Sequence, residues 1–313
     1  MLENLDSLPD NEPYLWADYL EIWATISIDK CFSRGELYSI CRAQAKPKTR
    51  TFSDEKWQLA ITFIDTRIAL FGASYPFYLS QDRDTIHIKH DIIFDFSENE
   101  KLYIALLFCA NVKYIKYKKR HILTGSFEKI SLPIFKSLMP SDATITPCWA
   151  SAGNNGTYTG LLYDKLVQIA NDIRCSANFT PAYFKPGDRG DGGIDMLAWH
   201  DMADTRPSIP IAFAQCGCSK DEWVAKQLEA SPVKMLHMLP VIHPWVNYYF
   251  LPHDLRWHNA DWAHLSDIGA AIFVDRLRLI NLTIRNGWIS HARNTRYVRY
   301  LVNRQISVSD LVP

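Results

Sequence analysis

The sequence predicts an α/β protein: a mixed central sheet flanked by helices, preceded by a mostly helical N-terminal domain. In the first half of the chain, apolar residues recur every three to four positions, the period of a helix with one buried face. Residues 193–200 and 209–216 are two short apolar runs separated by a polar turn, as in adjacent buried strands. A helix and a further apolar run follow, which is typical of a strand that rejoins a sheet through a crossover helix.

Length and composition indicate two domains. The chain has 313 residues, of which 48% are hydrophobic and 22% charged, ordinary values for a globular protein. Prolines and glycines gather in residues 140–156, so we expect one domain over residues 1–150 and a second over residues 151–313. No apolar run reaches the roughly 18–20 residues of a membrane span, and the acidic start MLENLDSLPDNEPY is not a signal peptide. We therefore expect a cytoplasmic protein without a membrane partner.

Charge and cysteine content limit the classes of function. Lysine plus arginine and aspartate plus glutamate both number 34, so the formal net charge is zero. This balance weakens the case for a chain that binds nucleic acid over its whole surface, because phosphate contacts supply most non-specific affinity. A local basic patch is still compatible with it. Seven irregularly spaced cysteines favour reduced thiols over a disulfide framework.

Helical periodicity and capping residues locate the elements of the N-terminal domain. Prolines precede the first helix, Ser53 is a candidate N-cap, and Gly72 is a candidate C-cap. The domain carries no catalytic constellation. In chain order we expect helices at residues 14–30 (amphipathic), 33–43, 54–71 and 98–110, a polar loop at 44–54, and extended chain at 73–97.

Short apolar runs alternate with helical patterns in the rest of the chain. A helical piece at residues 126–139 should break at Pro133, because proline removes a helical hydrogen bond. We then expect strands at residues 178–184, 193–200, 209–216 and 247–251, and helices at residues 160–174, 221–230 and 264–286.

The most basic stretch, KYIKYKKRH at residues 113–121, interleaves cations with Tyr114 and Tyr117. Such a pattern can hold a phosphate backbone and stack on bases. The alternative is a solvated helix end whose tyrosines pack in the core. The first interpretation predicts a nucleic-acid-binding patch made of Lys116, Lys118, Lys119 and Arg120.

The residues that carry chemistry lie in the stretch GDGGIDMLAW…AQCGCSKDEW. Asp195 starts one apolar run, where a buried carboxylate is costly unless it is paired or binds a metal. Gln215 ends the next run, and the interval is long enough for one hairpin that brings both side chains to one edge of the sheet. The alternative is that Asp195 caps a turn after two glycines and that Gln215 is an ordinary strand-end amide.

This stretch resembles the core of the PD-(D/E)XK, or restriction-endonuclease-like, nucleases. That family places an Asp at a hairpin and then Glu or Gln with Lys on the next strand, after a helix that often bears an acidic residue. The resembling segment runs from about Gly160 to Pro252, roughly a third of the chain. Asp195 matches the family's Asp and Gln215 its Glu or Gln. The sequence departs from the family at Gly217, where a lysine is expected.

The resemblance implies a site that uses Mg²⁺ or Mn²⁺ to hydrolyse DNA. Asp195 would be the principal ligand, joined by the amide oxygen of Gln215 and the backbone carbonyl of Cys216. The ion would neutralise phosphoryl oxygens and activate a water. Asp164, in the preceding helix, would be the family's additional acid and a further ligand. Its alternative role is that of an acid at the N-terminus of its own helix.

The same resemblance requires a lysine that orients the water and stabilises the developing negative charge. Because residue 217 is glycine, this lysine would have migrated into the following helix. Lys226 and Lys220 are the two candidates, and each alone is compatible with a solvated helix lysine.

Other chemistry finds less support in the sequence. Cys216 and Cys218 form a CxC pair, but a zinc site needs two further ligands, and His200, His237 and His243 form no tight second pair. Neither a P-loop GxxxxGK[ST] nor a GxGxxG after a strand is present. Any ATPase would therefore belong to another chain.

The resemblance finally implies the effector subunit of a bacterial anti-phage defence system, with DNA as substrate and a partner protein that supplies sensing or ATPase function. The helical domain would bind that partner or hold the nuclease inactive. An alternative from another class is a catalytically inactive nuclease-like module that binds nucleic acid or a partner protein, and Gly217 supports it. A structural subunit of a larger assembly is a third alternative, and formation of a homo-oligomer stays open.

Overall fold

The computed structural model describes residues 2–44, 46, 48–149, 157–287, 295–303 and 306. The chain forms two units, each with its own core. Unit 1 comprises residues 1–123, 252–265 and 275–313, and unit 2 comprises residues 124–251 and 266–274. The chain therefore first passes from one unit to the other at residues 123–124, whereas the predicted domain boundary lies near residue 150.

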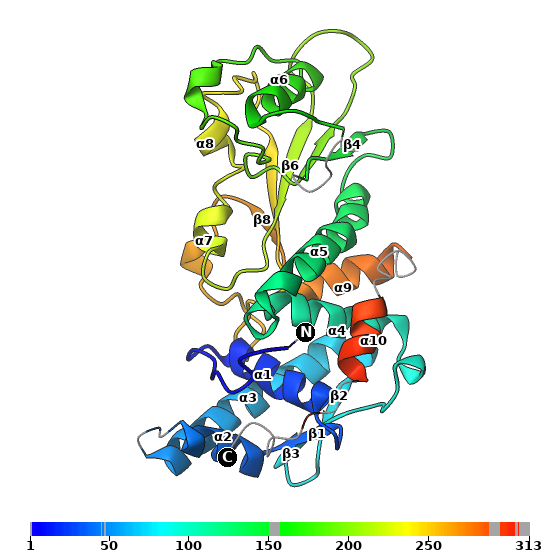
Figure 1. The fold of residues 1–313 in the computed structure, drawn as a ribbon. Coiled ribbons are helices and arrows are strands. Elements are labelled where there is room, and N and C mark those ends of the chain that lie inside the picture. The colour runs from blue at the N-terminus through cyan, green and yellow to red at the C-terminus, as the bar shows by residue number, and fades with distance from the viewer. Residues whose placement is uncertain are drawn as a thin grey trace. The chain divides into compact units, whose positions relative to one another are not determined.

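Unit 1 consists of helices and one small antiparallel sheet (Figure 1). Capping boxes start two of its helices, with Ser33 and Glu36 at one and Ser97 and Glu100 at the other. The predicted helices near residues 33–43 and 98–110 are confirmed. The helices are α1 (Pro13–Ile26), α2 (Arg34–Ala43), α3 (Thr49–Phe71), α4 (Glu98–Ala110), α9 (Arg276–Arg285) and α10 (Thr295–Val302), and the sheet has the order β1 (Cys31–Ser33), β3 (Thr85–Ile88), β2 (Phe77–Leu79).

Every residue of α1 is buried, so the prediction of an amphipathic helix is wrong about its exposed face. The two acids of this helix find arginine partners from distant parts of the chain. Arg67 Nη2 lies 2.8 Å from Asp18 Oδ1, and its Nη1 lies 2.7 Å from Glu21 Oε1. Arg276 donates from both Nη atoms to Asp18 at 2.8 Å, and Arg67 Nε donates to Asp254 Oδ2 at 3.1 Å. Buried ion pairs thus join α1, α3, α9 and the segment around residue 254.

Unit 2 is organised around a mixed five-stranded sheet (Figure 1). The first two neighbouring pairs are antiparallel and the last two are parallel. The predicted α/β class with a mixed sheet is confirmed. The order is β4 (Thr144–Pro147), β5 (Met196–Trp199), β6 (Ile211–Cys216), β7 (Val246–Phe250), β8 (Ile272–Val274).

Helices cover both faces of this sheet. α6 (Leu162–Asp172) packs Leu166 and Ile169 into a core with Leu197 and Phe213. Phe135 of α5 (Tyr117–Ser137) contacts Tyr248 and Phe250 by edge-to-face ring packing. Since Tyr248 and Phe250 alternate with Tyr249, α5 and Tyr249 lie on opposite faces of β7. The remaining helices are α7 (Trp223–Lys226) and α8 (Pro232–Met235), with 3-10 turns at Gly72–Ser74, Ile93–Asp95, Val112–Tyr114, Pro181–Tyr183 and Leu265–Asp267.

Two predicted strand and helix assignments in unit 2 are wrong. Residues 178–184 contain a 3-10 turn, and the first strand is β4, inside the proline-rich stretch at residues 140–156. A strand of four residues next to prolines shows no periodicity. Residues 264–286 are not one helix but a turn, then β8, then α9. β8 is three residues long and is defined by its pairing with β7, which no local pattern reveals.

Two predicted helix limits are also wrong. α5 continues through Pro133, because Ile130 and Ile134 on either side of it are buried and this packing outweighs one lost hydrogen bond. α3 begins at Thr49, inside the predicted loop, and the Ser53 hydroxyl donates to Arg50 O within the helix instead of capping it. In the part of the chain that the structure describes, no helix combines the length and hydropathy needed to cross a bilayer.

Candidate active site

Asp195 lies immediately before β5 and is held on three sides by the backbone of its neighbours. Its N–H donates to Ala214 O at 3.0 Å, and its carbonyl accepts from Cys148 N–H at 2.8 Å. Its carboxylate Oδ2 accepts from Cys216 N–H at 2.6 Å. The residue is only 8% exposed. The antiparallel hairpin therefore fixes a buried carboxylate beside the end of β6.

Gln215 lies across the hairpin from Asp195. Met196 pairs with Ala214 as the last pair of the ladder, and the Asp195 N–H also donates to Ala214 O, so Asp195 lies just beyond β5 at the end of the hairpin where Gln215 lies in β6. Gln215 is 5% exposed, and its Nε2 donates to Glu229 Oε2 at 2.6 Å. Its Oε1 is buried and accepts no hydrogen bond from any residue that the structure describes. Asp195 and Gln215 thus lie at the same end of the β5–β6 hairpin, and their use as one site stays a prediction.

Two carboxylates that the sequence did not single out lie near Asp195. Burial raises the pKa of Asp195 well above its usual value, the negative charges of Asp191 and Glu128 raise it further, and Lys226 opposes them. Burial and the charge of Asp191 also raise the pKa of Glu128 to about 7. Glu128 comes from α5, and Asp191 comes from the glycine-rich turn, where its Oδ1 accepts from Gly193 N–H at 2.9 Å. The principal charged influences on Asp195 among the described residues are thus Asp191, Glu128 and Lys226.

Lys226 is the candidate lysine whose positive charge acts on Asp195, where it lowers the pKa of the carboxyl group. It ends α7, and its Nζ lies 2.6 Å from Glu222 Oε2 on the same helix. The next residue, Gln227, anchors this helix, because its Oε1 accepts from Gly269 and Ala270 N–H at 3.3 and 3.2 Å. Helix α7 ends at residue 226, so the predicted helix at 221–230 is too long.

Lys220, the other candidate, lies in a turn before α7 and is half-buried. Its Nζ donates to Asp221 Oδ1 at 2.6 Å. Its charge is not among the principal influences on Asp195, which come from Asp191, Glu128 and Lys226. Lys226 is therefore the better placed of the two.

Asp164 lies at the N-terminus of its own helix, which is the alternative role that the sequence allowed. Its Oδ2 accepts from Leu161 N–H at 2.9 Å at the start of α6. The neighbouring Lys165 is 7% exposed and donates from Nζ to Arg189 O at 2.9 Å and Gly190 O at 3.0 Å. This helix therefore anchors the glycine-rich turn that carries Asp191.

Gly217, at the position where the nucleases that the sequence resembles have lysine, has no room for a side chain. A Cβ atom there would lie 1.9 Å from Tyr249 Oη and 2.7 Å from its Cζ. Tyr249 Oη is buried and forms no hydrogen bond within the described part of the chain. Burial raises the pKa of this phenol, as do the charges of Asp195 and Glu229, so the hydroxyl stays protonated.

The cysteines of unit 2 are free thiols. Burial raises the pKa of both Cys148 and Cys216, with Asp195 as the next contributor, so neither is an activated nucleophile. Among the described residues, no three His, Cys, Asp or Glu side chains come together as a metal-binding group. The predicted ligand set consists of the Asp195 carboxylate, the amide oxygen of Gln215 and the backbone carbonyl of Cys216. Only the first of these is a His, Cys, Asp or Glu side chain.

The basic segment at residues 113–121 has both exposed and buried side chains. Lys116, Lys118 and Lys119 are exposed at the start of α5. The two aromatic residues differ, because Tyr117 is 79% exposed whereas Tyr114 is buried. Arg120 serves the local backbone: its Nε donates to Ile115 O at 2.9 Å, and its Nη2 lies 3.5 Å from Glu3 Oε1.

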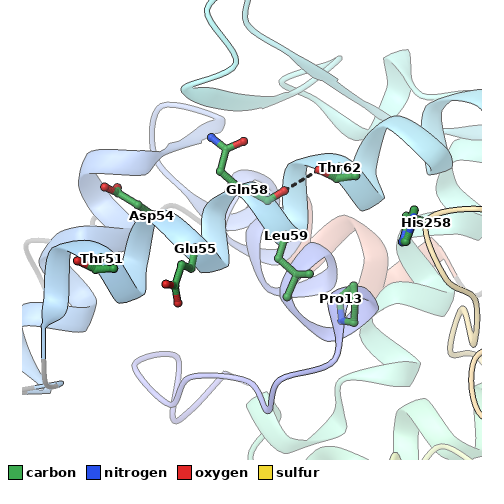
Figure 2. A pocket seen from close by; sticks show the side chains of 8 residues that line it. All are labelled: Pro13, Thr51, Asp54, Glu55, Gln58, Leu59, Thr62 and His258. Carbon is green, nitrogen blue, oxygen red and sulfur yellow. Dashed lines mark hydrogen bonds between the residues drawn. The ribbon is translucent and has the colours of Figure 1, made fainter.

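A separate hollow of about 610 Å³ lies in unit 1 along α3 (Figure 2). Asp54 in its wall is already paired with Arg34 at 2.9 Å, and Thr62 Oγ1 donates to the Gln58 carbonyl of its own helix. The wall therefore offers no group of reactive side chains. Its lining is Pro13, Thr51, Asp54, Glu55, Gln58, Leu59, Thr62 and His258.

No family model, curated protein or solved structure matches the chain. The chemistry of the site has to be judged from its own residues. These are a buried carboxyl group, a buried amide oxygen without a partner, two further carboxylates and a lysine.

Proposed function

We propose that this chain is a metal-dependent nuclease that hydrolyses phosphodiester bonds of DNA, with a core of the restriction-endonuclease type. The observation that carries the proposal is the Oε1 atom of Gln215, which is buried, has no partner among the described residues, and lies at the same end of the hairpin as Asp195. A buried acceptor without a partner costs about 1–3 kcal/mol. A divalent cation held by Asp195 would satisfy this oxygen and also remove the penalty of a buried carboxylate.

The order of the elements supports the same proposal. The resemblance requires an Asp at a hairpin, a Gln on the next strand, and a crossover helix that leads to a parallel neighbour. Asp195 precedes β5, Gln215 lies in β6, α7 follows, and β7 pairs in parallel with β6. Glu128 of α5, which precedes β4, fills the place of the helix acid for which Asp164 was predicted.

The residues present fit a hard divalent cation. Carboxylate, amide and carbonyl oxygens from Asp195, Gln215 and Cys216 are the ligand types that Mg²⁺ and Mn²⁺ accept, with waters completing the shell. When bound, such an ion neutralises phosphoryl oxygens and makes a coordinated water more acidic. Glu128, with a pKa of about 7, is suited to take a proton near neutral pH. Lys226 supplies positive charge for the developing phosphoryl charge.

Features outside the site support the proposed substrate, partner and compartment. The exposed Lys116, Lys118 and Lys119 beside Tyr117 suit a nucleic-acid backbone. With zero net charge and no nucleotide-binding motif in the sequence, the chain fits an effector that acts with a partner protein in anti-phage defence. Seven free cysteines fit the reducing cytoplasm as its compartment.

One observation favours a second candidate function, a catalytically inactive nuclease-like module that binds nucleic acid or protein. The family's lysine position is Gly217, and Tyr249 fills the space where a side chain would go. In such a module Asp195 would be a structural residue, and its replacement would leave nucleic-acid binding unaltered.

The test is cleavage of supercoiled plasmid and linear DNA in Mg²⁺ or Mn²⁺. We expect wild type to cleave, Asp195→Ala to be inactive, and Lys226→Ala to be at least tenfold slower. Lys220→Ala is the matched control and should retain activity, because the charge of Lys220 is not among the principal influences on Asp195. A fully active Asp195→Ala variant would refute the proposed function. An inactive wild type that binds DNA equally well with and without Asp195 would favour the inactive module.

A further inference from the structure

Tyr249 lies on the same face of the sheet as Gln215. β6 and β7 pair in parallel with Gln215 opposite Tyr249, and the ladder continues as Gly217 N–H donates to Phe250 O at 2.9 Å. Side chains opposite one another in adjacent strands project to the same side. Tyr249 therefore projects toward the side of the sheet on which the Gln215 side chain lies.

The hydroxyl of Tyr249 occupies the space of the side chain that Gly217 lacks. A Cβ atom at residue 217 would be 1.9 Å from Oη, so any other residue would displace the phenol. Glycine at this position and tyrosine at residue 249 therefore depend on each other. The departure from the family at residue 217 is a replacement of one side chain by another that comes from the neighbouring strand.

The same hydroxyl is a buried polar group that no described residue satisfies. Tyr249 is fully buried, and phenylalanine would fill its place without that cost. Asp195 and Glu229 lie close enough for their charges to act on the phenol. An unsatisfied donor beside these carboxylates calls for a partner that is present only when the site works.

We propose that Tyr249 is a positioning residue, whose hydroxyl donates a hydrogen bond to the attacking water held beside Asp195. It thereby takes over the part that a lysine at residue 217 plays in the related nucleases. This inference rests on the proposed nuclease function. It adds a residue from β7 to a site otherwise built from β5, β6, α5 and α7.

The test compares wild type with Tyr249→Phe, which removes one oxygen and keeps the ring. We measure metal-dependent cleavage of plasmid DNA as kcat and KM, the pH profile of kcat, and thermal unfolding. We expect kcat to fall at least tenfold with KM nearly unchanged, because the hydroxyl acts on the water and not on DNA binding. The melting temperature should stay the same or rise, because a buried unsatisfied group has been removed.

The double variant Gly217→Lys/Tyr249→Ala is the matched rescue. It puts a lysine at the family's position and opens the space that the lysine needs, so it should cleave faster than Tyr249→Ala alone.

Each outcome decides the inference. A Tyr249→Phe variant with wild-type kcat overturns it and leaves the proposed nuclease function standing. A variant that loses activity together with thermal stability also overturns it, because the hydroxyl would then be structural. A wild type that does not cleave DNA refutes the nuclease function itself, and this inference with it.

Discussion

The side-chain amide of Gln215 donates from Nε2 to Glu229 Oε2 at 2.6 Å. An amide whose nitrogen faces a carboxylate must turn its oxygen the other way. Gly193 makes this contact feasible, because a Cβ atom there would lie 2.5 Å from Glu229 Cβ. The Gln215–Glu229 pair therefore orients the unpartnered Oε1 on which the proposed cation site depends.

Gln215→Glu should destabilise the protein at neutral pH. It would place two carboxylates in contact where an amide and a carboxylate now share a hydrogen bond. We expect a loss of roughly 1–3 kcal/mol in the free energy of unfolding at pH 8, and a smaller loss at pH 5, where one carboxyl can hold a proton. Urea denaturation at the two pH values measures both.

The swapped variant Gln215→Glu/Glu229→Gln is the control for this pair. It restores one amide and one carboxylate with their positions exchanged, so most of the stability should return. A double variant as unstable as Gln215→Glu alone would show that the contact does not govern the stability of this region.

Glu128 should make stability depend on pH. Its folded pKa of about 7 lies above the ordinary glutamate value, so the folded state binds a proton that the unfolded state releases. The stabilising proton is fully bound below the ordinary pKa and is lost as pH rises toward 7. We expect stability to decrease over this window in wild type, and the decrease to be smaller in Glu128→Gln. Thermal unfolding between pH 4.5 and 8 tests this, and an unchanged profile in the variant would contradict it.

Arg67→Ala should be among the most destabilising single changes. Arg67 pairs with Asp18, Glu21 and Asp254 in the core of unit 1, and its removal takes from the buried Glu21 the one ion-pair partner that it has among the described residues. We expect a loss of about 3–5 kcal/mol. Arg34→Ala is the matched control, because Arg34 pairs with surface acids and should cost about 0–1 kcal/mol. Equal losses in the two variants by urea denaturation would refute this role.

Charge reversal of Lys116, Lys118 and Lys119 to Glu should weaken DNA binding. Each lysine that contacts a phosphate contributes about 0.9 to the slope of log affinity against log salt concentration, so the slope should fall by roughly 2–3. Fluorescence anisotropy over a range of salt concentrations measures it. The control reverses three exposed lysines elsewhere, Lys48, Lys185 and Lys234. Equal losses in both triple variants would mean that the basic segment has no special role.

The central hairpin is the part of the site that local sequence could predict. β5 and β6 are apolar runs bounded by glycine and proline turns, and Asp195 and Gln215 lie at the start of the first run and near the end of the second, which is one end of the hairpin. Helices α2 and α4 were equally accessible, since their capping boxes are local patterns. Each of these predictions depends on residues close together in the chain.

What the sequence did not reveal depends on long-range contacts. Glu128 lies on a helix whose periodicity does not single it out, and its nearness to Asp195 comes from the way α5 covers the sheet. Tyr249 matters because the register of β7 against β6 sets it beside Gln215, and the predicted crossover did not reveal that register. Asp164 was predicted as a metal ligand because it is an acid in the helix before the core strands. Its carboxylate instead accepts a local hydrogen bond from Leu161 N–H.

The most direct test of the proposed site is divalent-cation binding by isothermal titration calorimetry, with Mn²⁺ as the probe. The account predicts that wild type binds Mn²⁺, that Asp195→Ala does not, and that Gln215→Ala binds it more weakly. Asp164→Ala is the control and should bind like wild type, because its carboxylate is engaged at the start of α6. A wild type that binds no Mn²⁺, or an Asp195→Ala variant that binds it with unchanged affinity, would contradict the account.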